Sequence, residues 1–272
     1  MRVGLVQMCS GREPERNLAD ATALIREAAS QGAQFIATPE TCNIMDEDLE
    51  RVRAKVGLEA EDQHVKAYGQ LAQELGVNLL AGSLTLLGES GKLANRSILF
   101  GPNGAIQARY DKIHLFDVQL GGGETYRESD RYQGGDQAVL ADLSGVKLGL
   151  SICYDVRFGA LHRELALAGA DMISVPAAFT KITGEAHWHV LLRARAIETG
   201  CFILAPAQAG LHENGRETFG HSVIINPWGE VIAERAEGPG IVLADLDISE
   251  VAKARGRVPS LQHSKEFRID PL

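Results

Sequence analysis

The residues with the clearest chemical potential are a cysteine, a glutamate and a lysine, each directly following an apolar run typical of a strand. Cys153 ends the run LGLSIC, Glu40 follows FIATP, and Lys112 follows IQARYD. In α/β proteins, ligands bind beyond the carboxyl ends of strands. A thiolate can attack a carbonyl carbon, a carboxylate can move protons, and an ammonium can stabilise a developing oxyanion. Together these residue types predict cleavage of an amide through a thioester.

Taken one at a time, these residues have ordinary explanations. Cysteine is among the most buried residue types, so an isolated cysteine is usually structural. A glutamate at a strand end often caps a helix or faces solvent, and a lysine there is often solvated. We expect the other three cysteines, Cys9, Cys42 and Cys201, to be buried structural thiols. What distinguishes Cys153 is its combination with the other two segments.

The segments TPE, DKIHLFD and SICYDVRF occur in this order and together resemble the nitrilase (carbon–nitrogen hydrolase) superfamily. The resemblance covers nearly the whole chain. It implies that Cys153 is the nucleophile and that Glu40 is the general base that later protonates the departing amine. It also implies an oxyanion hole formed by Lys112 and the backbone N–H of Tyr154. No metal and no cofactor are expected.

The resemblance extends to further site residues. It implies a second glutamate in the loop after the lysine motif, where Glu128 in YRESD is the match and Glu124 is the alternative. The second half looks like the branch that includes deaminated-glutathione amidase and ω-amidase, which hydrolyse α-keto acid amides. Such a substrate carries a carboxylate, and Arg157 matches the position of its cationic anchor. Phe179 and Thr183 match positions that line the substrate pocket.

Arg157 and its neighbours also have ordinary interpretations. Arg157 could form a structural ion pair with Asp155 or with a neighbouring helix. His187 and His189 are two residues apart on a predicted helix, so they point to different faces and make a poor metal pair. Trp188 is expected to pack in the core rather than stack on substrate. A helix ion-pair network is expected from the remaining charged residues of this segment, namely Arg193, Arg195 and Glu198.

Short β-rich runs alternate with longer helical segments along the chain, which is typical of an α/β sandwich. The expected strands are Val3–Met8, Gln34–Ala37, Asn78–Leu84, Ser97–Phe100, Ile106–Tyr110, Lys147–Ile152, Met172–Val175, Phe202–Ala205, His221–Ile225, Glu230–Ala233 and Ile241–Asp245. The expected helices are Arg16–Gln31, Asp62–Leu75, Leu161–Ala168, Ala186–Thr199 and Ile248–Arg255. The polar, glycine-rich stretch Gly121–Asp136 is expected to be a functional or disordered loop.

An internal repeat connects the two halves of the sequence. GAQFIATPE (Gly32–Glu40) resembles GADMISVPA (Gly169–Ala177), and SILFGPNGAI (Ser97–Ile106) resembles SVIINPWGEV (Ser222–Val231). The run around GLVQM resembles that around GLSI, and the order is the same in both halves. The repeat predicts two similar half-domains, each supplying a sheet to a shared core. The family resemblance implies that they form an αββα sandwich, here a single domain over residues 1–272.

Composition limits the partners and the location of the protein. The net charge of −9 argues against nucleic acid or an anionic membrane as the main partner. The family resemblance implies a small-molecule amide as substrate. We find no signal peptide and no apolar run near ~18 residues, so no membrane span is expected. Four widely spaced cysteines without a CxxC motif favour free thiols in the cytoplasm and make zinc unexpected. Members of the family commonly form homo-oligomers, dimers or larger.

Other activities remain open at this stage. The same three residues could serve a nitrilase or an N-carbamoyl amidohydrolase, and the fold could also carry a catalytically silent scaffold. A Cys–His hydrolase would need a histidine in contact with Cys153; His114 lies next to the lysine motif, although the family mechanism needs none. The run Gly121–Gly123 lacks the context of a phosphate loop, so nucleotide binding is not expected.

Overall fold

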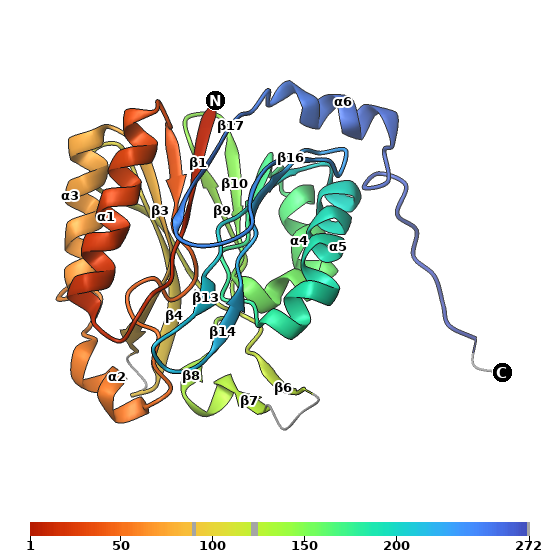
Figure 1. Cartoon of the computed structure of the whole chain (residues 1–272). Coiled ribbons are helices and arrows are strands. Elements are labelled where there is room, and N and C mark those ends of the chain that lie inside the picture. The colour runs from red at the N-terminus through yellow and green to blue at the C-terminus, as the bar shows by residue number, and fades with distance from the viewer. Residues whose placement is uncertain (89–90, 121–124, 271–272) are drawn as a thin grey trace.

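The computed structural model describes residues 1–88, 91–120 and 125–270 and places two sheets face to face, with helices on both outer sides (Figure 1). The first sheet has the order β17-β1-β2-β3-β4-β5, with β8 beside β4. Its strands are β1 (Arg2–Gln7), β2 (Phe35–Ala37), β3 (Asn78–Leu87), β4 (Leu93–Phe100), β5 (Ile106–Asp111), β8 (Tyr132–Gln133) and β17 (Gly240–Asp245). Helices α1 (Pro14–Ser30) and α3 (Gln63–Leu75) cover its outer face, and α2 (Leu49–Lys55) lies at one end.

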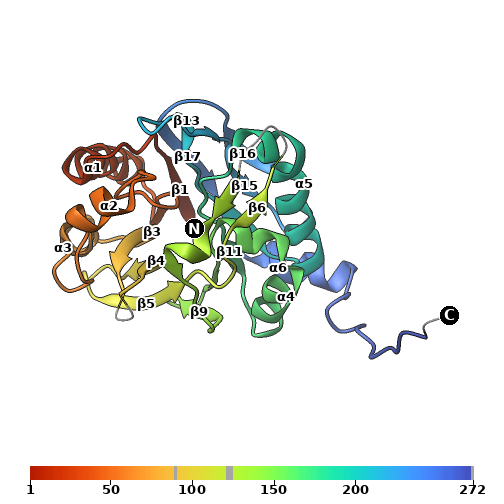
Figure 2. The same ribbon diagram turned by 90° about the horizontal axis from the view of Figure 1, so that it is seen from below.

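The second sheet has the order β16-β15-β12-β11-β10-β9. Its strands are β9 (Val139–Asp142), β10 (Lys147–Leu150), β11 (Met172–Ser174), β12 (Phe202–Ala205), β15 (Ser222–Ile225) and β16 (Val231–Arg235). Helices α4 (Gly159–Leu167) and α5 (Lys181–Thr199) cover its outer face, as the view from below also shows (Figure 2). The two sheets and their helices therefore form the expected αββα sandwich.

The two halves share one strand plan. In the first half, β1, β2 and β3 are parallel, and β4 and β5 follow as antiparallel strands. The second half repeats this plan with β10, β11, β12, β15 and β16. Even the register matches, because Gly4 lies opposite Ile36 and Gly149 lies opposite Ile173. This agreement confirms the predicted pair of similar halves.

Residue alternation along the strands explains how the layers pack. Val3 and Leu5 of β1 point into the core between the sheets, whereas Val6 joins the cluster beneath α1 and α3. Leu148 and Leu150 of β10 enter the same central core from the second sheet. Successive strand residues face opposite sides of a sheet, so a strand buried on both faces reads as a continuous apolar run.

The helix ends are fixed by capping residues. Asp62 accepts hydrogen bonds from two backbone N–H groups in the first turn of α3, and Gly76 ends this helix with a positive φ of 65°. Thr180 caps α5, whose last residue is followed by Gly200 at φ 61°. The predicted start of α5 at Ala186 was therefore too late, because the helix begins directly after the Thr180 cap.

Most predicted strands are confirmed within a few residues, and both Pro-x-Gly segments form hairpin turns, between β4 and β5 and between β15 and β16. The sequence did not reveal α2 or several short strands. Those strands form the β6 (Asp117–Gln119)–β7 (Thr125–Arg127) and β13 (Ala209–Leu211)–β14 (Glu217–Phe219) hairpins. The stretch Gly121–Asp136 is also more ordered than predicted: it contains β7, a 3₁₀ turn η2 (Glu128–Asp130) and β8. Gly121–Gly123 and Glu124 lie outside the described residues.

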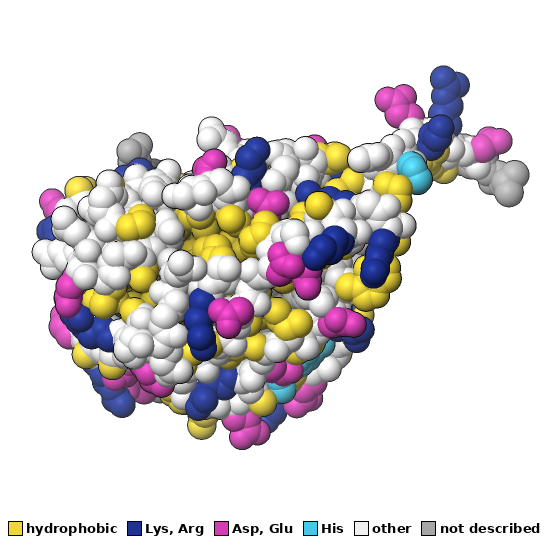
Figure 3. Space-filling model, turned by 90° about the horizontal axis from the view of Figure 1, so that it is seen from above, with side chains coloured by type: hydrophobic (Ala, Val, Ile, Leu, Met, Phe, Trp, Pro, Cys, Tyr) yellow, Lys and Arg dark blue, Asp and Glu magenta, His cyan; other side chains and the backbone are white. Residues whose placement is uncertain are grey.

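The chain ends in α6 (Ser249–Arg257), followed by an extended segment that projects from the body of the molecule (Figures 1 and 3). Phe267 and Ile269 in this segment are 85% and 84% exposed. Among the described helices, none combines the length and apolarity that crossing a bilayer requires.

Candidate active site

Three loops at one end of the sandwich bring Glu40, Lys112 and Cys153 together in a cavity of about 300 Å³. Glu40 follows β2, Lys112 follows β5, and Cys153 begins the 3₁₀ turn η3 (Cys153–Arg157) after β10. All three side chains are at least nine-tenths buried. The carboxylate comes from the first half and the thiol from the second, so the site exists only where the two sheets meet.

The Glu40 carboxylate is held by donors on both oxygens. Its Oε1 accepts hydrogen bonds from Lys112 Nζ and Asn95 Nδ2, each at 2.9 Å, and its Oε2 accepts one from the N–H of Ala178 at 2.8 Å. Cys153 lines the same cavity, where burial and then the charge of Glu40 raise the pKa of its thiol. Glu40 is therefore an oriented carboxylate in the cavity that also holds the thiol, as a general base requires.

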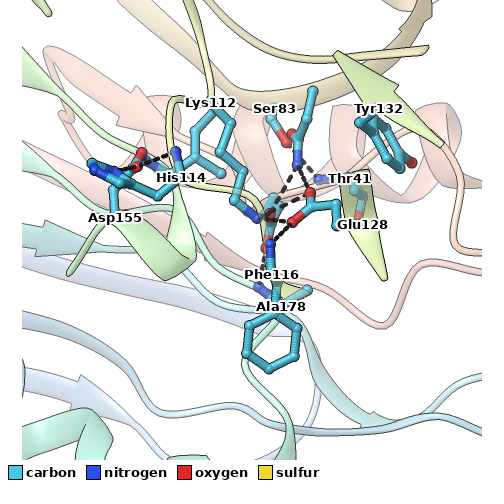
Figure 4. Close-up of polar contacts among 12 residues, drawn as sticks. Thr41, Ser83, Lys112, His114, Phe116, Glu128, Tyr132, Asp155 and Ala178 are labelled. Carbon is cyan, nitrogen blue, oxygen red and sulfur yellow. Dashed lines mark hydrogen bonds and ion pairs between the residues drawn. The ribbon is translucent and has the colours of Figure 1, made fainter. Parts of the chain in front are cut away.

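A second carboxylate, Glu128, completes the charge pattern (Figure 4). Lys112 Nζ lies 2.9 Å from Glu128 Oε2, and Asn95 Nδ2 donates to Glu128 Oε1 at 3.1 Å. The N–H of Phe116 donates to Glu128 Oε2 at 2.6 Å. Lys112 thus bridges two carboxylates, and Glu128 holds the ammonium in place rather than touching the thiol itself.

Mutual charges set the resting protonation states of this group. Burial raises the pKa of the Glu40 carboxyl, but the charge and hydrogen bonds of Lys112 bring it below its usual 4.5. Burial lowers the pKa of Lys112, yet the carboxylates of Glu128 and Glu40 raise it well above 10.5. Burial, and then the charge of Glu40, raise the pKa of the Cys153 thiol well above 9.0. The resting site therefore holds a carboxylate, an ammonium and a neutral thiol.

The backbone at Cys153 is bent into an uncommon conformation. Its φ is 48°, in the left-handed region that few non-glycine residues adopt. Its N–H donates to Pro176 O at 2.9 Å. The next residue, Tyr154, lies in the first turn of η3, where backbone N–H groups lack partners within the helix. The turn therefore places Cys153 and Tyr154 side by side at the cavity.

Asp155, fully buried, joins the cysteine turn to the lysine segment. Its Oδ2 accepts hydrogen bonds from the hydroxyl of Tyr110 at 2.6 Å and from the N–H of Ile152 at 2.8 Å. Its Oδ1 contacts His114 Nδ1 at 2.6 Å. These bonds fix Cys153 relative to Lys112. Asp155 pairs with His114, so the alternative interpretation of Arg157 as its ion-pair partner is wrong. The sequence feature that could have indicated this role is an aspartate two residues after Cys153.

The walls of the cavity include Tyr154, Phe179 and Thr183 among the residues predicted to contact substrate. Arg157 is not part of the cavity wall. Its guanidinium carbon lies 5.8 Å from the ring centre of Tyr154 and 5.3 Å from that of Phe179, and it contacts His187. Arg157 therefore contacts two rings that line the cavity without lining it itself.

Sequence reasoning missed Arg216, which does line the cavity. Arg216 lies just before β14, donates to the carbonyl of Ala178 and stacks over Tyr126, with 5.4 Å between its guanidinium carbon and the ring centre. Its buried Nε has no hydrogen-bond partner among the described residues. No motif marks Arg216, because the loop that carries it reaches the site only through the β13–β14 hairpin.

The remaining cysteines and basic residues differ partly from expectation. Cys42 and Cys201 are buried, as predicted, but Cys9 is exposed, because it lies just past the end of β1 at the surface. Arg195 pairs with Glu198, whereas Arg193 donates to the carbonyl of Gly229 instead of joining an ion-pair network. Trp188 is fully buried and packs against Phe179, which confirms its core position. Among the described residues, no histidine lines the cavity.

Comparisons with known proteins agree with this geometry. Residues 2–256 match the model of the carbon-nitrogen hydrolase family. The chain is 42% identical over 262 residues to a deaminated glutathione amidase of Synechocystis, covering 95% of this chain and 96% of the relative. It is 32% identical to the human omega-amidase NIT2, covering 97% and 95% of the two chains.

A solved structure extends the match to the fold. Nit3 of Saccharomyces cerevisiae, a member of branch 10 of the nitrilase superfamily, superposes with a TM-score of 0.86 and 29% identity, covering 95% of this chain and 94% of that one. The sandwich, the duplicated strand plan and the family match together establish the class of protein. This chain belongs to the carbon–nitrogen hydrolase family, within the nitrilase superfamily of hydrolases.

Proposed function

We propose that the protein hydrolyses the terminal amide of a small α-keto acid amide that carries a carboxylate and releases ammonia. Deaminated glutathione is the leading substrate, and α-ketoglutaramate is the second. The observation that carries the proposal is the buried ion pair between the Glu40 carboxylate and Lys112 Nζ at the cavity that Cys153 also lines. The names of the two relatives indicate the substrate class.

In the first half of the proposed reaction, Glu40 accepts the thiol proton while Cys153 Sγ bonds to the amide carbon. Negative charge then develops on the carbonyl oxygen, where the Lys112 ammonium and the N–H of Tyr154 stabilise it. The C–N bond breaks, Glu40 returns the proton to the nitrogen, and ammonia leaves. A thioester on Cys153 remains.

In the second half, water attacks the thioester carbon while Glu40 takes one of its protons. The C–S bond breaks, the thiol regains a proton from Glu40, and the acid product leaves. Because the resting thiol is neutral and Glu40 is ionised, the thiolate forms only as attack begins. Glu128 serves as a positioning residue that keeps Lys112 charged and in place.

The carboxylate of the substrate needs a cationic partner, and two arginines are available. Arg157 is the position that the family resemblance indicates, and we propose that its side chain reaches the end of the substrate around Tyr154 and Phe179. Arg216 is already at the cavity and has an unpaired buried Nε among the described residues. Both are candidate anchors, and Phe179 and Thr183 line the cavity together with the proposed nucleophile.

We also propose a cytoplasmic homo-oligomer. The four free cysteines, including the proposed nucleophile, suit a reducing compartment. Apolar side chains are exposed on the C-terminal segment, at Phe267 and Ile269, and around a second cavity of about 580 Å³ beside α4, α5 and α6 that includes Trp228. Clustered exposed apolar surface commonly marks an interface between proteins, so a second copy of the chain is the proposed partner.

The test is an ammonia-release assay on deaminated glutathione, α-ketoglutaramate, a simple nitrile and an N-carbamoyl amino acid. We expect the first two to react and Cys153→Ala and Glu40→Gln to abolish turnover without unfolding the protein. Cys9→Ala is the matched control and should keep wild-type rates, because Cys9 lies outside the cavity. Preference for the nitrile or the carbamoyl compound would overturn the substrate class, and full activity of Cys153→Ala would overturn the mechanism.

A further inference from the structure

A cluster of two histidines and a glutamate lies outside the catalytic cavity. His189 comes from the middle of α5, His221 from the residue before β15, and Glu234 from β16. These elements pack together on the helix-covered side of the second sheet (Figure 2). The sequence alone does not connect the three residues, because 32 and 13 positions separate them along the chain (189 to 221, 221 to 234).

The three side chains point at one another. His189 Nε2 lies 2.9 Å from Glu234 Oε1, and His221 Nδ1 contacts the same oxygen. One potential ligand atom from each residue lies within 4.8 Å of the other two. Four ligands around a tetrahedral zinc ion at 2.0–2.1 Å would be roughly 3.3 Å apart. This spacing lies between the 2.9 Å distance from His189 to Glu234 and the 4.8 Å limit for the whole cluster.

The donor set and its exposure suit a metal ion with an open position. Two imidazoles and one carboxylate are the protein ligands of a known class of zinc sites, in which water supplies the fourth ligand. The side chains are 33%, 25% and 29% exposed for His189, His221 and Glu234, so an ion and its water can enter from solvent. A nearby Lys or Arg would oppose a cation, and no described salt bridge places one on Glu234.

The histidines are also held in place by their surroundings. His221 stacks on Phe219, with 4.1 Å between ring centres, and the edge of the His189 ring meets the His221 ring. The backbone of His221 is fixed by Trp188 Nε1, which donates to its carbonyl at 2.9 Å, and by its own N–H to Ala236 O. Ligands that are already oriented lose little freedom when a metal binds.

We propose that His189, His221 and Glu234 form a binding site for a divalent ion of the zinc class, which fastens α5 to β15 and β16. The sequence predicts no metal site, because the cysteines lack CxxC spacing and His187 and His189 point to different faces of one helix. The bound ion would brace Phe219, at the end of the β14 strand that follows Arg216. It takes no part in the thioester chemistry proposed for Cys153.

The test uses a Cys9→Ala/Cys153→Ala background, so that no accessible or catalytic thiol competes for the metal. The full-length, chelator-treated protein is titrated with Zn²⁺ by calorimetry, and a parallel sample is titrated with Co²⁺ and followed by visible absorption. We expect one Zn²⁺ per chain, a four-coordinate nitrogen/oxygen Co²⁺ spectrum, and a Tm that rises with Zn²⁺ concentration.

Conservative variants then assign the ligands. Glu234→Gln, His189→Gln and His221→Asn should each weaken Zn²⁺ binding by at least about tenfold. Asparagine suits the positive φ of 57° at position 221 better than most residues. His187→Gln is the matched control, because His187 is on the same helix but contacts Arg157; its affinity should be unchanged.

Several outcomes would overturn the proposal. They are the absence of saturable Zn²⁺ binding, a six-coordinate Co²⁺ spectrum, and Zn²⁺ binding that all three ligand variants retain. The Co²⁺ spectrum is recorded on a chain with all three ligands intact, so a folding defect in one variant cannot obscure the result. Each of these results would leave the three residues as a hydrogen-bonded surface cluster only.

Discussion

At the scale of single residues, the site is governed by the balance of one positive and two negative side chains around a thiol. Lys112 lies between Glu40 and Glu128, so the carboxylates keep the ammonium charged while the ammonium keeps Glu40 ionised. Burial, and then the negative charge of Glu40, raise the pKa of the Cys153 thiol and so oppose its ionisation to a thiolate. In the proposed mechanism, Cys153 is therefore activated by proton transfer during attack, in contrast with cysteine enzymes that hold a thiolate at rest.

The pH dependence should reflect these protonation states. The pKa of Glu40 lies below 4.5 and that of Lys112 well above 10.5, so neither group titrates near neutrality. We expect kcat/KM to be flat between about pH 6 and pH 8, measured by ammonia release in constant ionic strength. A half-loss near pH 6.5, where a histidine titrates, would instead favour a Cys–His mechanism.

The two arginines should be separable by substrate. Arg157→Ala and Arg216→Ala are each expected to raise KM at least about tenfold for a carboxylate-bearing amide, because an ionic anchor binds substrate and transition state alike. A neutral amide of similar size should be affected much less. The variant with the larger selective effect identifies the anchor. Equal losses on charged and neutral amides would argue that the arginine supports the cavity wall instead.

The sequence predicted which reactive side chains meet but not what holds them. Glu40, Lys112 and Cys153 each follow a strand, so their shared location could be inferred from order and type. Asn95 and Asp155 could not, because an inward-facing polar residue in a strand or turn carries no motif. Asn95 and Asp155 position the site through hydrogen bonds to residues far along the chain. Asn95 binds Glu40, 55 positions away, and Asp155 binds Tyr110, 45 positions away, and only the folded chain brings these pairs together.

At the scale of elements, the close approach of β3 to the two catalytic loops depends on Gly82. A Cβ at this position would lie 1.8 Å from Thr38 O and 2.7 Å from both Pro39 O and a side-chain atom of Pro176. Thr38 and Pro39 lead directly to Glu40. Pro176 lies two residues before Ala178, whose N–H donates to the Glu40 carboxylate. Any side chain at Gly82 must therefore displace the segment that carries Glu40, the proposed general base.

Gly82→Ala is expected to lower kcat/KM at least about tenfold and to destabilise the fold by about 1–3 kcal/mol, as overpacking does. Activity assays and chemical denaturation measure the two effects. Gly256→Ala is the matched control, because nothing lies within 4 Å of its added Cβ and it is in helix α6, where alanine is favoured. Wild-type behaviour of Gly82→Ala would show that the two loops can move apart without consequence.

Elements of regular pattern were predictable, and those fixed by distant contacts were not. Strands buried on both faces, such as β12, stand out as apolar runs, and the Pro-x-Gly turns fix their hairpins. The three-residue strands β13 and β14 have mixed polarity, and Thr218 and Phe219 of β14 lie against the start of α5. Local sequence holds too little information to predict such pairing.

At the scale of the whole molecule, the exposed apolar residues predict self-association. We expect sedimentation velocity to show a dimer or a larger assembly, and deletion of residues 262–272 to weaken it, because Phe267 and Ile269 would be lost. Leu58→Ala is a suitable control, since this exposed apolar residue lies in the loop before α3, away from the C-terminal segment. A monomeric full-length chain at assay concentrations would contradict the prediction.

The matched registers of β1–β2 and β10–β11 have a consequence for the number of reaction centres. Equivalent positions in the two halves place Met8 where the second half has Cys153, and Ala177 where the first half has Glu40. A thioether cannot expel ammonia from an amide, and a methyl group cannot shuttle a proton. The repeated strand plan therefore encloses one proposed acyl-accepting sulfur, so a pre-steady-state burst should liberate one equivalent of ammonia per polypeptide.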